Sequence, residues 1–321
     1  MLISVVIPNY NREQLIVDAM DSVYAQDYSP IEMIVVDDGS SDSSVEVVNQ
    51  WISSHNKEGF TSKLIQQENS GGNVARNSGI ANSNGDFIAF LDSDDLWDKD
   101  KLSKQLAEML SRDGIGAVYC GLRHVEYPAN TIIEDANRRY PQGELLAEML
   151  VKDSTSPTSC YLIRKEVFEK VGPFDTVLQA RQDWDMWIRI SAEYRIHAVK
   201  EVLVSYRHHE GERTASNPLK EIDAYRSIRS KYIGHYKRLP FLKRQKANGA
   251  YYKRMGRVHF HQKISTRKAL WYYLRAILSY PLDFDAFAAM MGVFFPKNLR
   301  RNIHLAWNKL FAKTRLAIRS H

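Results

Sequence analysis

The sequence predicts an α/β fold, in which a mostly parallel sheet is sandwiched by helices, followed by a basic α-helical C-terminal region. Three observations lead to this prediction. Strand-like and helix-like segments alternate through the first 120 residues, polar residues follow three of the strands, and the charge changes sign near residue 210. Strands that alternate with helices form βαβ units, and their right-handed crossovers make the strands parallel.

The strands and helices of this first part can be assigned in order. Five apolar segments are typical of strands: Ile3–Pro8, Ile31–Asp37, Ser62–Gln66, Phe87–Asp92 and Ala117–Cys120. Four segments between them have the period of a helix: Glu13–Gln26, Ser43–Ser54, Val74–Ala81 and Lys99–Ser111. Short polar residues mark helix starts, with Ser41 or Asp42 before the second helix and Asp98 before the fourth.

The second half of the chain is less regular at first and then helical. The apolar spacing predicts a helix over Asp183–Glu193, followed by a short strand over Ile196–Val199 or Val202–Tyr206. From about Pro218 onward the pattern is helical and basic, and proline is expected to interrupt it at three positions: Pro240, Pro281 and Pro296.

Length and composition exclude several classes of protein. With 321 residues, 44% of them hydrophobic, the chain can bury a full core. Its two cysteines, Cys120 and Cys160, are far apart and lack metal-ligand spacing, which argues against a disulfide framework and favours a reducing compartment. The apolar N-terminal segment has no basic leader and stops at Pro8, so it is expected to be a strand and not a signal peptide.

The charge is divided unevenly along the chain. Residues 1–210 carry 20 Lys and Arg against 33 Asp and Glu, a net −13, whereas residues 211–321 carry 24 against 5, a net +19; the two sum to +6. We therefore predict two domains, residues 1–210 and residues 211–321. A basic region of this kind usually has a polyanionic partner.

The most informative segment is the acidic end of one predicted strand, Asp92-Ser93-Asp94-Asp95. Three neighbouring carboxylates repel one another, and a hard cation such as magnesium or manganese neutralises them well. The same residues would also suit a helix N-terminus, so both interpretations stay open on this segment alone. Two other strands end in polar segments, Pro8–Asn11 and Asp37–Ser40, and ligands bind beyond the carboxyl ends of such strands. Together these ends predict a polar, metal-assisted site.

Five motifs occur in order along residues 1–210: Ser4–Asn11, Val35–Asp42, Asn69–Gly79, Leu91–Asp95 and Gln182–Asp185. In this the chain resembles the family 2 glycosyltransferases, inverting enzymes of the GT-A fold that use nucleotide-activated sugars. The resemblance implies that Pro8, Asn9 and Tyr10 line the base and ribose. It also implies that Asp38 accepts from a uracil ring N–H, with Asp37 in support, since a carboxylate is a strong acceptor. A strand-to-helix turn with a capping residue is the plainer interpretation of that pair.

The third motif is rich in glycine and leads into a helix. Its residues Asn69 and Gly71 would let the backbone approach phosphate at a helix N-terminus, and Arg76 supplies a planar cation for the diphosphate or for an aspartate of the site. A flexible loop before a helix would have a similar sequence.

The resemblance also assigns the acidic motif. It implies that Asp92, with Ser93 beside it, meets the nucleotide sugar and that Asp94 ligates Mn²⁺ or Mg²⁺. Asp95 would add a contact or cap a helix. The order Tyr206-Arg207-X-His makes His209 a second candidate metal ligand, and a surface histidine is the alternative.

Asp183 is the candidate catalytic base. It stands where the family usually has a Glu-Asp pair, here Gln182-Asp183, and it would take the proton of the acceptor hydroxyl. Asp185 is expected to face elsewhere, which disfavours a two-carboxylate hydrolase. A helix cap is the alternative role for Asp183.

The basic region lies outside the resemblance. It interleaves aromatic with basic residues at Trp271–Arg275, Phe294–Lys297, Leu299–Arg301 and Trp307–Phe311. Such helices suit an anionic lipid surface, which would make the protein cytoplasmic and peripheral on the inner face of a membrane. An ordinary helical subdomain and a site for an acidic protein are the alternatives. No recognised nucleic-acid module is present, so we expect no nucleic acid as partner.

These observations predict a metal-dependent, inverting glycosyltransferase. The resemblance implies a UDP-sugar as donor and a saccharide or polyprenyl-linked acceptor in cell-surface polysaccharide synthesis. A sugar nucleotidyltransferase is one alternative, although its loop after the first strand would be rich in glycine and arginine, unlike Asn9–Arg12. A non-catalytic protein that binds sugar or lipid is the other.

Overall fold

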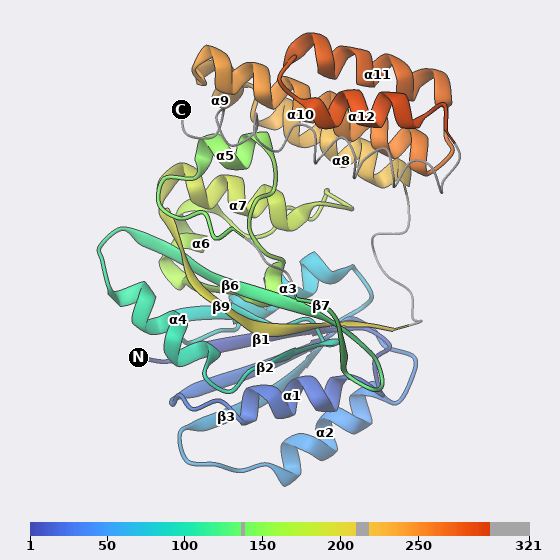
Figure 1. Cartoon of the computed structure of the whole chain (residues 1–321). Coiled ribbons are helices and arrows are strands. Elements are labelled where there is room, and N and C mark those ends of the chain that lie inside the picture. The colour runs from blue at the N-terminus through green and yellow to red at the C-terminus, as the bar shows by residue number, and fades with distance from the viewer. Residues whose placement is uncertain (136–138, 210–217, 296–321) are drawn as a thin grey trace. The chain divides into compact units, whose positions relative to one another are not determined.

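The computed structural model describes residues 1–135, 139–209 and 218–295 (Figure 1). The chain forms two compact units. The sheet unit comprises residues 1–149, 153–178 and 182–212, and the helical unit comprises residues 150–152, 179–181 and those from 213 onward. None of the described helices is both long enough and apolar enough to span a membrane.

The sheet unit is built on a nine-stranded sheet with the order β3-β2-β1-β4-β8-β6-β9-β5, and β7 pairs with β6. The strands are β1 (Ile3–Asn9), β2 (Ile31–Asp37), β3 (Phe60–Gln66), β4 (Phe87–Phe90), β5 (Asp95–Trp97), β6 (Ile115–Glu126), β7 (Thr131–Asp135), β8 (Tyr161–Arg164) and β9 (Arg195–His208). The sheet is parallel from β3 to β4, as predicted, and mixed beyond β4, where β8 runs antiparallel to both β4 and β6.

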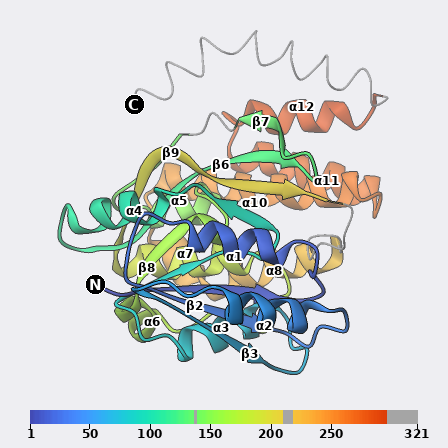
Figure 2. The same cartoon turned by 90° about the horizontal axis from the view of Figure 1, so that it is seen from below.

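Helices cover both faces of this sheet (Figures 1 and 2). They are α1 (Ile16–Tyr24), α2 (Ser44–Ser54), α3 (Gly72–Ala81), α4 (Lys101–Leu110), α5 (Leu146–Val151), α6 (Lys165–Val171) and α7 (Gln182–Glu193), with a 3₁₀ turn at Thr158–Cys160. The chain steps outward from β1 to β3 and then back to β4, so right-handed crossovers place α3 on the face opposite α1 and α2. All seven residues of β2 are buried, as expected for a strand covered on both faces.

The parallel register brings three strand ends together. Asn9 at the end of β1 lies opposite Asp37 at the end of β2, and Val6 of β1 lies opposite Phe90 at the end of β4. β4 is two residues shorter than predicted. The chain beyond it turns at once into β5, where Asp95 pairs with Tyr206 of β9. The acidic segment therefore lies between the end of β4 and the end of β9.

Some predicted boundaries were wrong, for local reasons. The two alternatives for a strand after residue 195 are parts of one long strand, β9, whose pairing with β6 shifts register where the strand is irregular. α4 follows Asp100 and not Asp98, because Asp98 pairs with Arg123 (Nη1 to Oδ2, 3.0 Å). The strands β5 and β8 were not predicted, since three or four residues carry little periodicity.

The helical unit contains α8 (Pro218–Lys231), α9 (Ile233–Arg238), α10 (Phe241–His261), α11 (Thr266–Ser279) and α12 (Phe284–Gly292). The interruptions expected at Pro240 and Pro281 are confirmed. A further break between α10 and α11 was not predicted; it contains Lys263 with a φ of 54°. The expected interruption at Pro296 and the motifs over 299–301 and 307–311 lie outside the described residues.

A buried carboxylate joins the parallel strands. Glu32 of β2 is 6% exposed. It accepts hydrogen bonds from Ser4 Oγ (2.6 Å), Lys63 Nζ (3.0 Å) and both the backbone N and Nδ2 of Asn84 (2.8 and 2.7 Å). Burial alone would raise the pKa of this carboxyl, but the hydrogen bonds outweigh it and lower the pKa from 4.5 to about 2. One side chain therefore connects β1, β2, β3 and the turn before β4.

Substitution of Glu32 by glutamine is expected to destabilise the sheet unit in a pH-dependent way. A carboxyl whose pKa is lower in the folded state stabilises above its unfolded value of 4.5, and this contribution is lost as the pH falls toward about 2. Allowing for screening by solvent, we expect about 2 kcal/mol at pH 6. Urea unfolding of wild type and E32Q from pH 6 to pH 3 measures the difference, which should narrow with falling pH. Exposed Glu46 of α2 gives the matched control, E46Q; an equal effect there would contradict this account.

Candidate active site

The first part of the site is a network of side chains at the ends of β1 and β2. Asp37 is 2% exposed and accepts from Asn9 Nδ2 (2.9 Å), from the backbone N of Ser40 (2.9 Å) and from Ser40 Oγ (2.6 Å). Ser40 Oγ in turn accepts from the backbone N of Asn11 (2.9 Å). Asp37 and Asn9 thus organise the loop from inside. Tyr10, by contrast, is 45% exposed and stands at the rim of this edge.

Asp38 binds the glycine-rich segment. Its Oδ1 accepts from Gln67 Nε2 (2.7 Å) and the backbone N of Ser70 (2.9 Å), and its Oδ2 accepts from the backbone N of Gly71 (2.8 Å). Asp38 is 3% exposed, and these three donors fill three of the about four acceptor positions of its two carboxylate oxygens. The main structural role of Asp38 is therefore to hold residues 69–71 beside β2.

The glycine-rich segment ends in the first turn of α3. Gly71 precedes the helix with a φ of +93°, a conformation that favours glycine, and Asn69, Gly71 and Gly72 are all exposed. Backbone N–H groups at a helix start attract anions. Arg76, one turn further on, binds Asp92 Oδ1 through Nη2 (2.5 Å), so the motif after β3 contacts the motif after β4.

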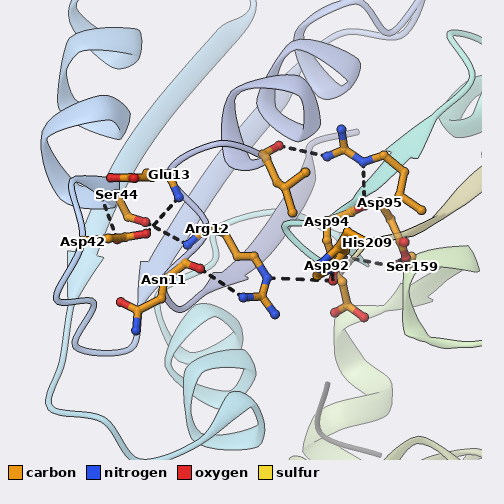
Figure 3. Close-up of polar contacts among 12 residues, drawn as sticks. Asn11, Arg12, Glu13, Asp42, Ser44, Asp92, Asp94, Asp95, Ser159 and His209 are labelled. Carbon is orange, nitrogen blue, oxygen red and sulfur yellow. Dashed lines mark hydrogen bonds and ion pairs between the residues drawn. The ribbon is translucent and has the colours of Figure 1, made fainter. Parts of the chain in front are cut away.

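The acidic cluster comes next along the sheet edge (Figure 3). Asp92 and Asp94 are partly exposed, with 31% and 26% of their side chains accessible. Asp94 Oδ2 lies 2.9 Å from Nε2 of His209, whose side chain is 6% exposed, and 4.0 Å from Nε of Arg12. Arg12 and His209, which are far apart in the sequence, therefore both lie beside the carboxylate of Asp94.

The other two residues of the acidic segment are buried. Asp95 is 1% exposed, and its Oδ2 accepts from Ser159 Oγ (2.6 Å), which itself accepts from the backbone N of Asp92 (3.1 Å). Burial, and next the charges of Asp94 and Asp92, raise the pKa of the Asp95 carboxyl well above its usual value. Asp95 belongs to β5, so the expectation that it caps a helix was wrong. Ser93 is 6% exposed, which leaves its side chain little access to a ligand.

A buried arginine fixes the backbone of the acidic segment. Arg207 is 1% exposed and donates from Nε to the carbonyl of Asp94 (2.7 Å), from Nη1 to Asp18 Oδ2 (2.5 Å) and from Nη2 to the carbonyl of Leu15 (3.0 Å). It therefore joins β9, the acidic segment and the start of α1. The sequence marked Arg207 only as part of a histidine pattern, and nothing in the sequence indicated Ser159.

The donor atoms at Asp94 and His209 fit a divalent cation. Ligand distances of about 2.1 Å at right angles place two donor atoms about 3 Å apart, close to the 2.9 Å between Asp94 Oδ2 and His209 Nε2. Within the described ranges, no group of three or more His, Cys, Asp or Glu side chains could hold a metal ion. The protein would thus offer two ligands and leave the remaining positions to substrate oxygens and water, as is common for magnesium.

Asp183 lies in the first turn of α7, half-buried, and its Oδ1 accepts from the backbone N of Trp184 (2.8 Å). Asp185, two residues on, is fully buried and accepts from Arg189 Nε (3.0 Å). It faces the protein interior, as expected. The two carboxylates therefore do not form a pair of equivalent groups.

α3 connects the acidic cluster with the segment before α7. Asn73 Nδ2 donates to the carbonyls of Asp175 (2.9 Å) and Leu178 (3.4 Å). Asn77 donates to the carbonyl of Phe174 (2.9 Å) and accepts from its backbone N (2.8 Å). The same helix carries Arg76, the partner of Asp92, so contacts through one helix link the predicted donor residues to the approach to Asp183.

All the predicted site residues except Asp183 lie at one edge of the sheet, where several strands end. The ends of β1, β2, β4 and β9 and the start of α3 carry Pro8, Asn9, Tyr10, Asp37, Asp38, Asn69, Gly71, Arg76, Asp92, Ser93, Asp94 and His209. Asp183 belongs to α7, and the α3 contacts reach Asp175 and Leu178, which precede that helix in the chain. The metal-binding, nucleotide-binding and catalytic roles of these residues stay predictions.

Comparison with known proteins gives a consistent result. The family model described as "Glycosyl transferase family 2" matches residues 4–172. A glycosyltransferase of Nostoc sp. is 34% identical over 221 residues, which are 65% of either chain. The "Putative teichuronic acid biosynthesis glycosyltransferase TuaG" of Bacillus subtilis is 41% identical over 111 residues, 35% of this chain and 43% of that one.

Two solved structures have a similar fold. Staphylococcus aureus TarS 1-349 in complex with UDP-GlcNAc has a TM-score of 0.63 at 20% identity and covers 95% of this chain and 87% of its own. The mannosyltransferase PcManGT of Pyrobaculum calidifontis, in complex with GDP-Man and Mn²⁺, has a TM-score of 0.55 at 20% identity and covers 97% of this chain and 80% of its own. At this identity the likeness concerns the fold, which is the GT-A fold.

Proposed function

The chain belongs to glycosyl transferase family 2, and from this premise we propose that it transfers a sugar from a nucleotide-sugar donor to an acceptor hydroxyl with inversion at the anomeric carbon. One observation carries the proposal. The partly exposed carboxylate of Asp94 meets His209 at 2.9 Å, at the same sheet edge where the helix start of α3 presents backbone N–H groups. A divalent cation and the N–H groups of a helix start each attract the oxygens of a diphosphate.

The nucleoside binds at the ends of β1 and β2 in this proposal. Pro8, Asn9 and Tyr10 line the base and ribose, and exposed Tyr10 offers an aromatic face. The one acceptor position left on Asp38 suits the ring N–H of uracil, and buried Asp37 supports the loop. A UDP-sugar is the donor that we favour, because TarS, which was solved with UDP-GlcNAc, has a higher TM-score than the neighbour solved with GDP-Man.

The diphosphate lies between the acidic cluster and α3. Asp94 and His209 would hold Mn²⁺ or Mg²⁺, which would supply positive charge beside the diphosphate leaving group. The N–H groups of Gly72 and Asn73, at the start of α3, face the phosphate oxygens in this proposal, because those of Ser70 and Gly71 already bind Asp38. Arg76 keeps Asp92 in place for the ribose or sugar hydroxyls, with Ser93 as backbone support.

Asp183 acts as general base in this proposal. It accepts the proton of the acceptor hydroxyl while that oxygen forms a bond to the anomeric carbon. The bond from the anomeric carbon to the diphosphate oxygen breaks on the opposite face, which inverts the configuration. The position of Asp183 in a first helical turn, where its carboxylate is half-buried but not fully enclosed, supports this role.

The acceptor is a saccharide or a polyprenyl-linked sugar in polysaccharide synthesis. The relative from B. subtilis is named for teichuronic acid biosynthesis, which supports an acceptor of this class. We further propose that the protein works in the cytoplasm, peripheral on the inner face of the membrane. The net charge of +19 over residues 211–321 supports attraction to an anionic membrane surface.

A thermal-shift screen tests the donor and the metal together. A UDP-sugar at about a hundred times its dissociation constant stabilises by about 2.7 kcal/mol, which should raise the Tm by about 5–10 °C. We expect this shift only with Mn²⁺ or Mg²⁺ present, and a smaller one with GDP-mannose. If no nucleotide sugar shifts the Tm with either ion, the proposed function is wrong.

A further inference from the structure

α11 has apolar side chains on two opposite faces. Its inward face is buried in the helical unit through Ala269, Tyr273, Ala276 and Ile277. The three largest apolar side chains on the other side are exposed: Trp271 by 47%, Leu274 by 48% and Leu278 by 70%. Their spacing of i, i+3 and i+7 places them on one stripe. We name Trp271, Leu274 and Leu278 the outer stripe of α11.

The outer stripe gathers exposed apolar side chains on one face of α11. Single exposed apolar residues are normal on soluble proteins, whereas a contiguous group marks an interaction surface. Leu282, four residues beyond Leu278 and 48% exposed, continues the same series past the end of the helix. Figures 1 and 2 show α10, α11 and α12 alongside one another, and the buried core between α11 and α12 includes Ala276, Ile277 and Ala286.

Charge identifies the kind of partner. Arg267, Lys268 and Arg275 of α11 are exposed, and the Arg275 guanidinium lies 4.7 Å from the ring centre of Trp271. Residues 224–282 contain 15 Lys and Arg and no Asp or Glu, and the carboxylates at either end of this stretch, Asp223 and Asp283, pair with Arg226 and Lys253 of α8 and α10. An apolar stripe flanked by the exposed basic side chains of Arg267, Lys268 and Arg275 suits a bilayer surface, in which anionic headgroups cover an apolar interior.

We propose that the outer stripe of α11 docks on a bilayer that contains anionic phospholipid. Leu274 and Leu278 enter the boundary between headgroups and acyl chains, and the Trp271 ring lies at the level of the headgroups. Arg267, Lys268 and Arg275 reach lipid phosphates with their charged ends. The inference rests on the proposed membrane location and gives it a specific surface, which would bring the enzyme to a lipid-linked acceptor.

Two other occupants fit the charges less well. A second copy of the chain would bring a second basic surface against the first. The chain's own residues 296–321 carry 7 Lys and Arg and no Asp or Glu, so they too have the wrong sign. Like charges that meet across an interface oppose association.

Vesicle co-sedimentation with the full chain tests the proposal. We expect binding to vesicles of phosphatidylcholine with phosphatidylglycerol, little binding to phosphatidylcholine alone, and loss of binding as salt rises from 50 to 500 mM. The double variant L274E/L278E should reduce partitioning at least about tenfold, because it removes two inserted side chains. Both positions are exposed, so the variant is expected to keep its fold, which circular dichroism checks.

The matched control is F241E/L242E at the start of α10. Phe241 and Leu242 are 62% and 69% exposed, so this variant adds the same two charges and removes the same kind of side chain from the same unit. F241E/L242E should lower vesicle binding only because it makes the protein less basic. The decrease should be several-fold smaller than the decrease caused by L274E/L278E. Equal loss in both variants, or no vesicle binding by the wild type, overturns the proposal.

Two further readouts separate the alternatives. If sedimentation shows a wild-type dimer that L274E/L278E dissociates, with vesicle binding unchanged, the stripe is a contact between copies and the proposal fails. Release of UDP from a UDP-sugar measures the proposed transferase independently of lipid. Vesicle binding without UDP release refutes the proposed function and leaves the docking surface standing. UDP release without vesicle binding refutes the docking surface and leaves the function standing.

Discussion

Substitution of Asp94 by asparagine is expected to reduce kcat by about a thousandfold, or about 4 kcal/mol of transition-state stabilisation. The amide keeps the shape of the side chain but removes the charge that pairs with His209 at 2.9 Å and that would hold the cation. As the nucleoside diphosphate leaves, its developing charge then has no fixed counter-charge. Turnover of a UDP-sugar across a manganese titration gives both kcat and the apparent metal affinity.

Asp95 provides the matched control for Asp94. Both residues belong to the same acidic segment, but Asp95 is 1% exposed in β5 and is bound by Ser159 Oγ at 2.6 Å. We expect D95N to stay within about fivefold of wild-type turnover, with an unchanged manganese optimum. If D94N keeps the wild-type dependence on manganese, Asp94 is not a ligand, and the proposed metal site is wrong.

Substitution of Asp183 by asparagine should lower kcat by a factor of about 10²–10⁴, the usual contribution of general base catalysis. Donor binding should not change, because Asp183 lies in α7 and not at the strand ends assigned to the nucleotide. The acidic limb of the pH profile for kcat/KM should also disappear, since that limb reports the base of the free enzyme. Thermal shift with the donor and steady-state turnover separate the two effects.

Asp185 is the control within the same helix. Asp185 is fully buried and pairs with Arg189, whose Nη1 also binds the carbonyls of Val171 and Gly172. Removal of that charge leaves a buried guanidinium short of a partner, so D185N should lose about 3 kcal/mol of stability. Its turnover per folded molecule should stay near wild type. Turnover by D183N within twofold of wild type would exclude Asp183 as the base.

The sequence located the parallel part of the sheet well, because its strands are buried on both faces and its helices have clear periodicity. β2 coincides with the predicted strand Ile31–Asp37, and α2 differs from its prediction by one residue. The polar residues after β1, β2 and β4 were found for the same reason. In a parallel sheet, the order of strands in sequence already implies which strand ends share an edge.

The parts that were missed depend on contacts between distant residues. Arg207 binds the carbonyl of Asp94 across 113 positions, and Ser159 joins Asp92 to Asp95 from a 3₁₀ turn of three residues. Neither has a local pattern. The sequence assigned Asp38 to a ligand or to a capping turn and missed its role as an anchor, because its bonds to Gln67, Ser70 and Gly71 exist only once β2 and β3 lie side by side.

The four hydrogen bonds between the side chains of Asn73 and Asn77 and the backbone of residues 174–178 have a consequence for the proposed binding of substrates. They hold α3, the helix that we assign to phosphate binding, against residues 174–178, which precede the proposed base Asp183 in the chain. We therefore expect a tilt of α3 on donor binding to move residues 174–178 with it. Attempts to retarget this enzyme to a new donor by altering α3 will reshape acceptor preference at the same time.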